Sequence, residues 1–208
     1  MKTVEIFLFL VILIFSVVVH EVSHGVIADK LGDPTARDAG RLTLNPIPHI
    51  DLFGSILLPV FLLLVNSPIL FGAAKPVPVN FMNLRNPKRD MALVSLAGPG
   101  SNFILALACS IPLRFGLIDL NTAGGAFLLQ VVVLNLVLAI FNLIPIPPLD
   151  GSKILASVLA DRYLPMFFAL ERYGFLLIIL FLFTGLFSAV LIPALNFFLT
   201  LLIGVPLL

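Results

Sequence analysis

The sequence carries little charge. Only 11% of its 208 residues are Asp, Glu, Lys or Arg, whereas roughly 25% is usual in a soluble domain. A hydrophobic share of 60% and a mean hydropathy of +1.17 leave too few polar side chains to cover a water-facing surface. These values exclude a soluble globular protein and predict a polytopic membrane protein with the lipid bilayer as its surroundings.

Other scarcities narrow the function further. The net charge is only +1, so a nucleic-acid partner, which is bound through many basic side chains, is not expected. A single cysteine, Cys109, excludes a disulfide within the chain. The sequence contains no internal repeat and no polar stretch long enough for a second soluble domain. We therefore expect one domain over residues 1–208, and a homo-oligomer of this domain stays open.

Long apolar runs are present, and they predict membrane segments. A spanning helix needs about 20 mostly apolar residues, and such runs occupy residues 6–28, 52–74, 91–112 and 126–144. Pro59 and the stretch Asn66–Pro68 interrupt the second run. Residues 173–208 carry no charge, but as one helix they would measure roughly 54 Å, too long for one crossing. We expect two short helices there, with a turn between Gly185 and Pro193.

The first run contains the pattern His20-Glu21-Val22-Ser23-His24, an H-E-x-x-H. Residues i and i+4 share one face of a helix, so the two imidazoles can bind one metal ion, with Glu21 beside it as a general base. The alternative is a buried histidine pair satisfied by hydrogen bonds. Ionisable groups inside a bilayer are costly and usually functional, which favours the metal site.

A catalytic zinc site needs a third protein ligand and an open position for water. Asp150 is the best candidate because it follows an apolar run broken by three prolines, and an acid at membrane depth usually belongs to a site. It could instead cap a short amphipathic helix at residues 152–163. His49, in a loop rich in turn residues, is the weaker candidate. Zinc, as one ion, is expected from the ligand types.

A second motif extends the argument beyond the first helix. Asn142-x-x-Pro145-x-Pro147-x-Leu149-Asp150-Gly151, together with H-E-x-x-H, resembles the site-2 protease family of intramembrane zinc metalloproteases. The stretches 32–34, 45–46, 74–80 and 97–102 are also similar to that family, the first three to its compact bacterial and archaeal branch. The chain has no room for the PDZ or CBS domain that many members carry.

The resemblance covers roughly residues 6–160, which we take as the catalytic core, followed by C-terminal membrane helices at 173–208. It implies an endopeptidase that hydrolyses peptide bonds within or near the membrane helices of other proteins. It also implies roles for six residues. His20, His24 and Asp150 would hold zinc, Glu21 would be the base, Asn142 and Pro145 would lie near the substrate, and Asn102 lies in a matching stretch.

The side-chain amides of the two asparagines also suggest a chemical role. Asn102 and Asn142 could donate a hydrogen bond to the substrate backbone or to a developing oxyanion. The alternative is a polar contact between membrane helices.

A rival function for the whole cluster is a metal or proton transporter that uses the same His, Glu and Asp side chains. Transporters commonly contain inverted repeats, and none is found here. A non-catalytic scaffold is the other rival, and the intact Glu21 disfavours it.

The ligand positions also constrain the topology. His20 and His24 lie near the end of the first helix and Asp150 lies beyond the end of the fourth, so these helices must run parallel. We therefore predict an all-α protein of about five to six membrane segments, in which residues 52–74 re-enter rather than cross. Ten of the twelve Lys and Arg residues then lie on the active-site side. By the positive-inside rule this side faces the cytoplasm, in a prokaryotic cell membrane.

Overall fold

The computed structural model describes residues 2–51, 57 and 75–204, and in this part of the chain every regular element is a helix. The expected re-entrant segment 52–74 lies outside the described residues, apart from residue 57. The main helices are α1 (Lys2–Lys30), α4 (Pro87–Arg114), α5 (Ala123–Asn142), α6 (Asp150–Val158), α7 (Leu164–Glu171), α8 (Gly174–Phe183) and α9 (Leu186–Leu202). Short turns of helix occur at α2 (Thr35–Asp38), η1 (Ile47–His49), η3 (Phe81–Asn83) and η4 (Asp161–Tyr163).

The described residues contain three helices that are long and apolar enough to cross a membrane: Val4–Lys30, Pro87–Arg114 and Ala123–Asn142. A bent pair, Asp161–Glu171 with Leu176–Leu182, raises the number to four if it counts as one span. These three contain most of the runs predicted at 6–28, 91–112 and 126–144. The predicted total of five to six segments is not confirmed.

The C-terminal apolar run is divided into two helices as expected, and the break lies at Gly185, the first residue of the range in which the turn was predicted. Gly185 has φ +73° and separates α8 from α9, whereas Pro193 lies inside α9. A glycine adopts this left-handed conformation without the steric penalty of a Cβ atom. The 17 residues of α9 measure about 25 Å at 1.5 Å per residue, which is slightly short of the hydrocarbon core.

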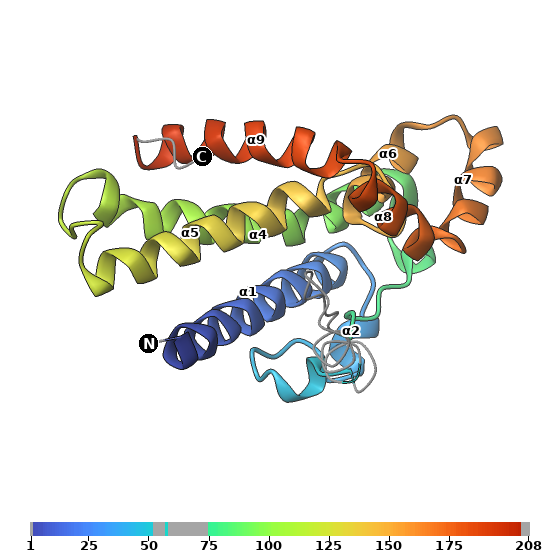
Figure 1. Cartoon of the computed structure of the whole chain (residues 1–208). Coiled ribbons are helices and arrows are strands. Elements are labelled where there is room, and N and C mark those ends of the chain that lie inside the picture. Colours follow the sequence, from blue (N-terminus) through green and yellow to red (C-terminus); the bar gives the residue numbers. More distant parts are fainter. Residues whose placement is uncertain (1, 52–56, 58–74, 205–208) are drawn as a thin grey trace.

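The helices form a bundle in which α1, α4, α5 and α9 lie side by side, with α6 and α8 at one end (Figure 1). Its main core lies between α4, α5 and α9, where Leu136 and Leu199 are fully buried. The pairs His20–Asn102 and His24–Val94 show that α1 runs antiparallel to α4. Because α5 returns alongside α4 (Figure 1), α1 and α5 are parallel. The end of α1, the first half of α4 and the end of α5 therefore meet.

Candidate metal centre

Three side chains from distant parts of the chain converge at this meeting point. The Nε2 atoms of His20 and His24 lie 3.1 Å apart, and each lies 3.1 Å from Oδ2 of Asp150. All three residues are buried. They form the one group of three or more His, Cys, Asp or Glu with metal-binding spacing in the described part of the chain. The structure thus brings together the three predicted ligands.

The hydrogen bonds of the two imidazoles fix which nitrogen carries the proton. Nδ1 of His24 donates to the Val94 carbonyl oxygen at 2.7 Å, and Nδ1 of His20 donates to Oδ1 of Asn102 at 2.6 Å. The Asn102 amide cannot turn round, because its NH2 group donates to Asn135 Oδ1 at 2.9 Å and to the Ser16 carbonyl at 3.3 Å. In the neutral imidazoles both Nε2 atoms therefore carry lone pairs.

The arrangement fits a tetrahedral cation. Oδ2 of Asp150 is buried and has no hydrogen-bond partner among the described residues, so three electron-rich atoms face one another without a proton between them. A tetrahedral zinc ion with ligands at about 2.0 Å keeps those ligands about 3.3 Å apart. The observed spacing of 3.1 Å is close to that value. A cation at the centre would remove the repulsion between the lone pairs.

A glycine on α4 leaves room for the ion. A Cβ atom at Gly98 would lie 2.4 Å from Nε2 of His24 and 2.5 Å from Nε2 of His20. Any side chain at this position would therefore clash with the two nitrogen atoms that face the proposed ion. A Cβ atom at Gly100, half a turn further along the same helix, would have no neighbouring atom within 4 Å, so the restriction is specific to Gly98.

Asp150 reaches the site because the chain turns sharply after α5. The residue is the first of α6, and Leu149 occupies the N-cap position, so Asp150 is not the N-cap. Gly151 packs against the end of α5, where a Cβ atom would lie 2.2 Å from the Leu143 carbonyl oxygen. The amphipathic helix predicted at 152–163 in fact begins at Asp150 and ends at Val158, and residues 161–163 form a separate helical turn.

The three ligands open into a cavity of about 250 Å³. Glu21 lines this cavity, and its Oε2 accepts a hydrogen bond of 2.8 Å from the backbone N–H of Val77. A carboxylate beside two imidazoles and a second carboxylate, that of Asp150, can move a proton within the cavity. The complete lining is His20, Glu21, His24, Pro76, Val77, Val79, Phe81, Val94, Ser95, Asn142, Pro148, Leu149, Asp150 and Lys153.

The other residues singled out in the sequence lie in different places. Asn142 lines the cavity and its Nδ2 donates to the Leu138 carbonyl at 3.0 Å. Asn102 is fully buried behind His20 and is not part of the lining. Pro145 is exposed in the turn after α5 and also lies outside the lining. His49 is buried elsewhere, with Nε2 2.9 Å from the Thr43 carbonyl oxygen, and does not join the ligand group.

Sequence reasoning missed several residues of the site. Lys153 lies three positions after Asp150 on α6, and this helical spacing would have placed it on the same face. Ser95 lies in the lining with a buried hydroxyl that has no partner among the described residues. Val77 contributes a backbone N–H, and a main-chain group leaves no signal in the residue types. Gly98 packs closely against α1, and such a tertiary contact cannot be predicted from local sequence. In the sequence it stands out only as part of a stretch that resembles the family.

Comparisons with known proteins agree with this chemistry. The family model described as peptidase family M50 matches residues 118–185. The chain is 41% identical over 196 residues to "Putative zinc metalloprotease YwhC" of Bacillus subtilis (strain 168), which covers 88% of this chain and 84% of that protein. It is 32% identical over 189 residues to "Putative zinc metalloprotease Rip2" of Mycolicibacterium smegmatis, covering 88% and 66%.

A more distant relative comes from an archaeon. The chain is 28% identical over 153 residues to "Zinc metalloprotease MJ0392" of Methanocaldococcus jannaschii, covering 74% of this chain and 34% of that protein. No solved structure matches the chain.

Proposed function

The chain belongs to peptidase family M50, the site-2 protease family, and from this premise we propose that His20, His24 and Asp150 hold its catalytic zinc and that Glu21 is the general base. The protein is a zinc-dependent metalloendopeptidase. The observation that carries the residue assignment is the mutual spacing of 3.1 Å between the two Nε2 atoms and Oδ2 of Asp150. Family membership gives no support to the transporter considered from the sequence.

The bound zinc would supply Lewis acidity, since zinc lowers the pKa of a bound water to about 7 and polarises a carbonyl. Glu21 accepts the proton of the attacking water and later gives it to the leaving amine. Asn142 and Lys153 line the same cavity, where each can donate a hydrogen bond to the substrate backbone or to negative charge on its carbonyl oxygen. His20 and His24 stay neutral, with Nδ1 protonated, to present Nε2 to the ion.

In this proposal Asn102 does not donate to the substrate or the oxyanion, and its bonds match the alternative of a polar contact between membrane helices. Its Oδ1 holds His20 Nδ1–H, and its NH2 group is engaged by Asn135 and Ser16. All polar groups of the Asn102 side chain are hydrogen-bonded within the protein, and the residue does not line the cavity. Asn102 therefore orients the ligand His20 and does not contact the substrate. Such outer partners of metal-bound histidines fix the tautomer and the ring orientation.

The substrates are membrane proteins, as expected for this family. We place the scissile bond within or near a single membrane-spanning helix. A peptide carbonyl in an intact helix is hydrogen-bonded, so the helix must unwind before attack, and Gly, Pro or Asn near the cut would favour unwinding. Pro145, exposed in the turn between α5 and Asp150, remains a prediction as a residue near the substrate.

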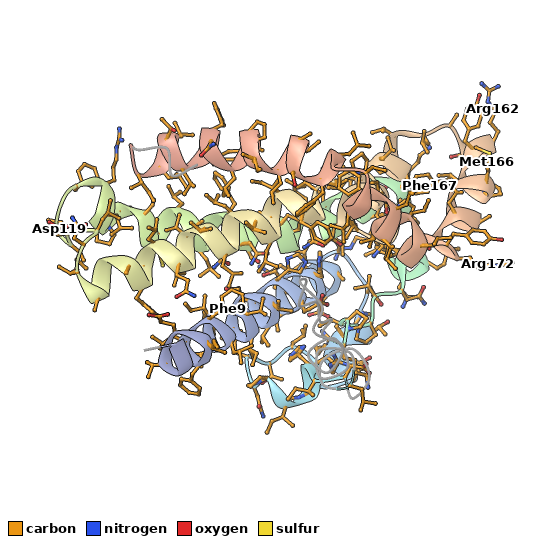
Figure 2. All side chains as sticks on the ribbon, in the orientation of Figure 1. Phe9, Asp119, Arg162, Met166, Phe167 and Arg172 are labelled. Carbon is orange, nitrogen blue, oxygen red and sulfur yellow. The ribbon has the colours of Figure 1, made fainter. Side chains whose placement is uncertain are left out.

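The charge distribution supports an active site toward the cytoplasm, and the bacterial and archaeal relatives support a prokaryotic cell. Asp119 lies at one end of the molecule, and Arg162 and Arg172 lie at the other (Figure 2), which is the end of the metal ligands. The backbone N–H of Lys75 donates to the His49 carbonyl at 2.8 Å, so residues 49 and 75 lie on one side of the bundle. This supports a topology without a net crossing between α1 and α4.

Labelling of single cysteines tests the orientation. In a Cys109→Ser background, an impermeant maleimide applied to intact cells should label Asn121→Cys, in the α4–α5 loop. Arg37→Cys and Met82→Cys, both exposed, should react only after the membrane is permeabilised. Labelling of position 37 or 82 in intact cells would place the active site on the outer side and contradict the proposal.

The catalytic assignment is tested with purified protein in detergent. The wild type should contain one zinc per chain and cleave a single-span reporter protein whose membrane helix has a central Asn-Gly pair. Glu21→Gln should keep the zinc and lose cleavage by at least about a hundredfold, since general base catalysis contributes about 10²–10⁴-fold. Cleavage at the wild-type rate by Glu21→Gln would show that another group is the base. Zinc flux into proteoliposomes without cleavage would instead favour the transporter.

A further inference from the structure

An extended segment, residues 75–80, lies along the cavity that contains the metal ligands. Its Pro76, Val77 and Val79 are part of the cavity lining. Because prolines 76 and 78 lack an N–H, the segment has only four backbone donors. Three of them bond to groups outside the segment: Lys75 to the His49 carbonyl at 2.8 Å, Val77 to Glu21 at 2.8 Å, and Asn80 to Asp33 at 2.7 Å.

The first end of the segment is held by a buried cation. Arg41 is 8% exposed, and its Nη2 donates to the carbonyl oxygens of Lys75 at 2.9 Å and Pro76 at 3.3 Å. Burying a guanidinium is costly unless hydrogen bonds offset the cost; these two bonds come from Nη2, whereas Nε is buried without a partner among the described residues. The two carbonyls immediately precede Val77, so the Arg41 bonds define where the Val77 N–H lies.

The second end is held by a buried anion. Asp33 is fully buried, and its Oδ2 accepts the Asn80 backbone N–H at 2.7 Å. Its Oδ1 accepts a hydrogen bond of 2.9 Å from Nδ2 of Asn83 and one of 3.2 Å from the Thr35 backbone N–H. Asp33 lies three residues after the end of α1 and is anchored to that helix, because its N–H donates to the Ala28 carbonyl at 2.9 Å. This end is therefore fixed to the helix that carries His20, Glu21 and His24.

The middle of the segment packs directly on α1. Gly25 lies one turn after Glu21, and a Cβ atom there would come within 2.8 Å of Cγ1 of Val77 and 2.6 Å of Cδ2 of Leu42. The absence of a side chain at position 25 lets Val77 approach the helix backbone. Val77 is buried in this contact, and its N–H meets the Glu21 carboxylate.

We propose that Arg41 and Asp33 are positioning residues of the protease: they hold residues 75–80 from both ends so that the Val77 N–H fixes the Glu21 carboxylate beside the metal ligands. The inference rests on the proposal that Glu21 is the general base. Neither side chain lines the cavity, so both act through the backbone of the segment. Without this hydrogen bond the Glu21 side chain would sample several rotamers, of which only some point at the attacking water.

The test uses the full-length protein with Arg41→Gln, Arg41→Lys and Asp33→Asn, and with Arg37→Gln as the matched control. Arg37 is an exposed arginine on α2 that pairs with Asp29 and Asp38. Zinc content, kcat per bound zinc and KM are measured on the single-span reporter. Amide hydrogen exchange is read at residues 75, 77, 79 and 80. Counting activity per bound zinc removes any loss due to unfolded protein.

In Arg41→Gln, kcat per bound zinc should fall between about tenfold and a hundredfold, the scale of a displaced catalytic group. KM should change by less than the change in kcat, and exchange at Val77 should accelerate at least about tenfold. Arg41→Lys, which keeps one charged donor, should recover part of the loss, and Arg37→Gln should match the wild type. Should Arg41→Gln fail to accumulate, Asp33→Asn carries the same expectations from the other end of the segment.

Wild-type kcat and wild-type Val77 exchange in Arg41→Gln and Asp33→Asn would overturn the inference. So would a loss confined to KM, which would make the segment a docking surface only, or a rise in kcat, which would make its contact with Glu21 inhibitory. Activity in Glu21→Gln tests the base assignment separately, so a failure there is distinguishable from a failure of the two positioning residues.

Discussion

Oδ1 of Asn102 lies 2.6 Å from Nδ1 of His20, and this one contact joins residues 82 positions apart. Asn102 is in turn held by Asn135 of α5 and by the Ser16 carbonyl of α1. Asn135 also donates to the Ser16 hydroxyl at 2.9 Å. These hydrogen bonds form a fully buried polar network that links the three long helices and ends at the Nδ1–H of His20, a proposed metal ligand.

Removing this network should weaken zinc binding without removing a ligand. We expect Asn102→Ala to bind zinc about 10- to 100-fold more weakly, the usual effect of losing an outer hydrogen bond to a ligating histidine. Competition with a chromophoric chelator measures the affinity. Ser101→Ala is the matched control, because its hydroxyl bonds to the Gly98 carbonyl and not to His20. Equal affinities in both variants would mean that Asn102 does not orient His20.

The space left by Gly98 gives a second prediction. In Gly98→Ala the new methyl group would lie within 2.5 Å of both Nε2 atoms, so the protein should lose zinc and with it all cleavage. Gly100→Ala adds the same methyl group to the same helix where nothing lies within 4 Å, and it should keep both. Zinc content by elemental analysis distinguishes the two, and a full complement of zinc in Gly98→Ala would refute the proposed ion position.

Much of the proposed ligand set follows from local sequence pattern. The i, i+4 spacing of His20 and His24 fixes a shared helix face whatever the rest of the fold does. Asp150 was predictable because an acid beside an apolar run with prolines has few inexpensive structural roles. The structure places its carboxylate where that argument requires, 3.1 Å from each imidazole. These inferences depend on local geometry and on the cost of burying charge.

The other parts of the site, and the number of membrane spans, depend on tertiary contacts that cannot be predicted from residue types. In the sequence Arg41 has the features of an ordinary loop residue, and Asp33 stands out only within a stretch that resembles the family. The role proposed for both depends on the path of residues 75–80. Pro145 belongs to a motif, but the turn that delivers Asp150 leaves this proline exposed. The described residues also contain fewer membrane spans than the five to six predicted for the chain. An apolar run can end as a bent pair such as Asp161–Glu171 with Leu176–Leu182, and composition does not reveal a bend.

Asp33 also makes stability depend on pH. Burial raises the pKa of this carboxyl, but the hydrogen bonds from Thr35, Asn83 and the Asn80 N–H outweigh burial and hold the pKa below its ordinary value. A group with a lowered pKa in the folded state stabilises the protein fully above its unfolded pKa of about 3.9. This contribution is lost as the pH falls from that value through the lower folded pKa.

We therefore expect Asp33→Asn to lower the midpoint of thermal unfolding at pH 7, and the difference from the wild type to narrow below about pH 3.9. Both proteins are compared in the presence of a chelator, so that loss of zinc in acid does not contribute. The same difference at pH 7 and at about pH 3, below the unfolded pKa, would show that the Asp33 charge does not contribute to stability.

The zinc content of Asp150→Asn is the most direct test of the three-ligand site. Asp161→Asn is its matched control, because Asp161 is an exposed aspartate that pairs with Lys88 at 2.9 Å, away from the cavity. The account predicts one zinc per chain in the wild type and in Asp161→Asn, and a large loss of bound zinc in Asp150→Asn after dialysis. One tightly held zinc per chain in Asp150→Asn would contradict it.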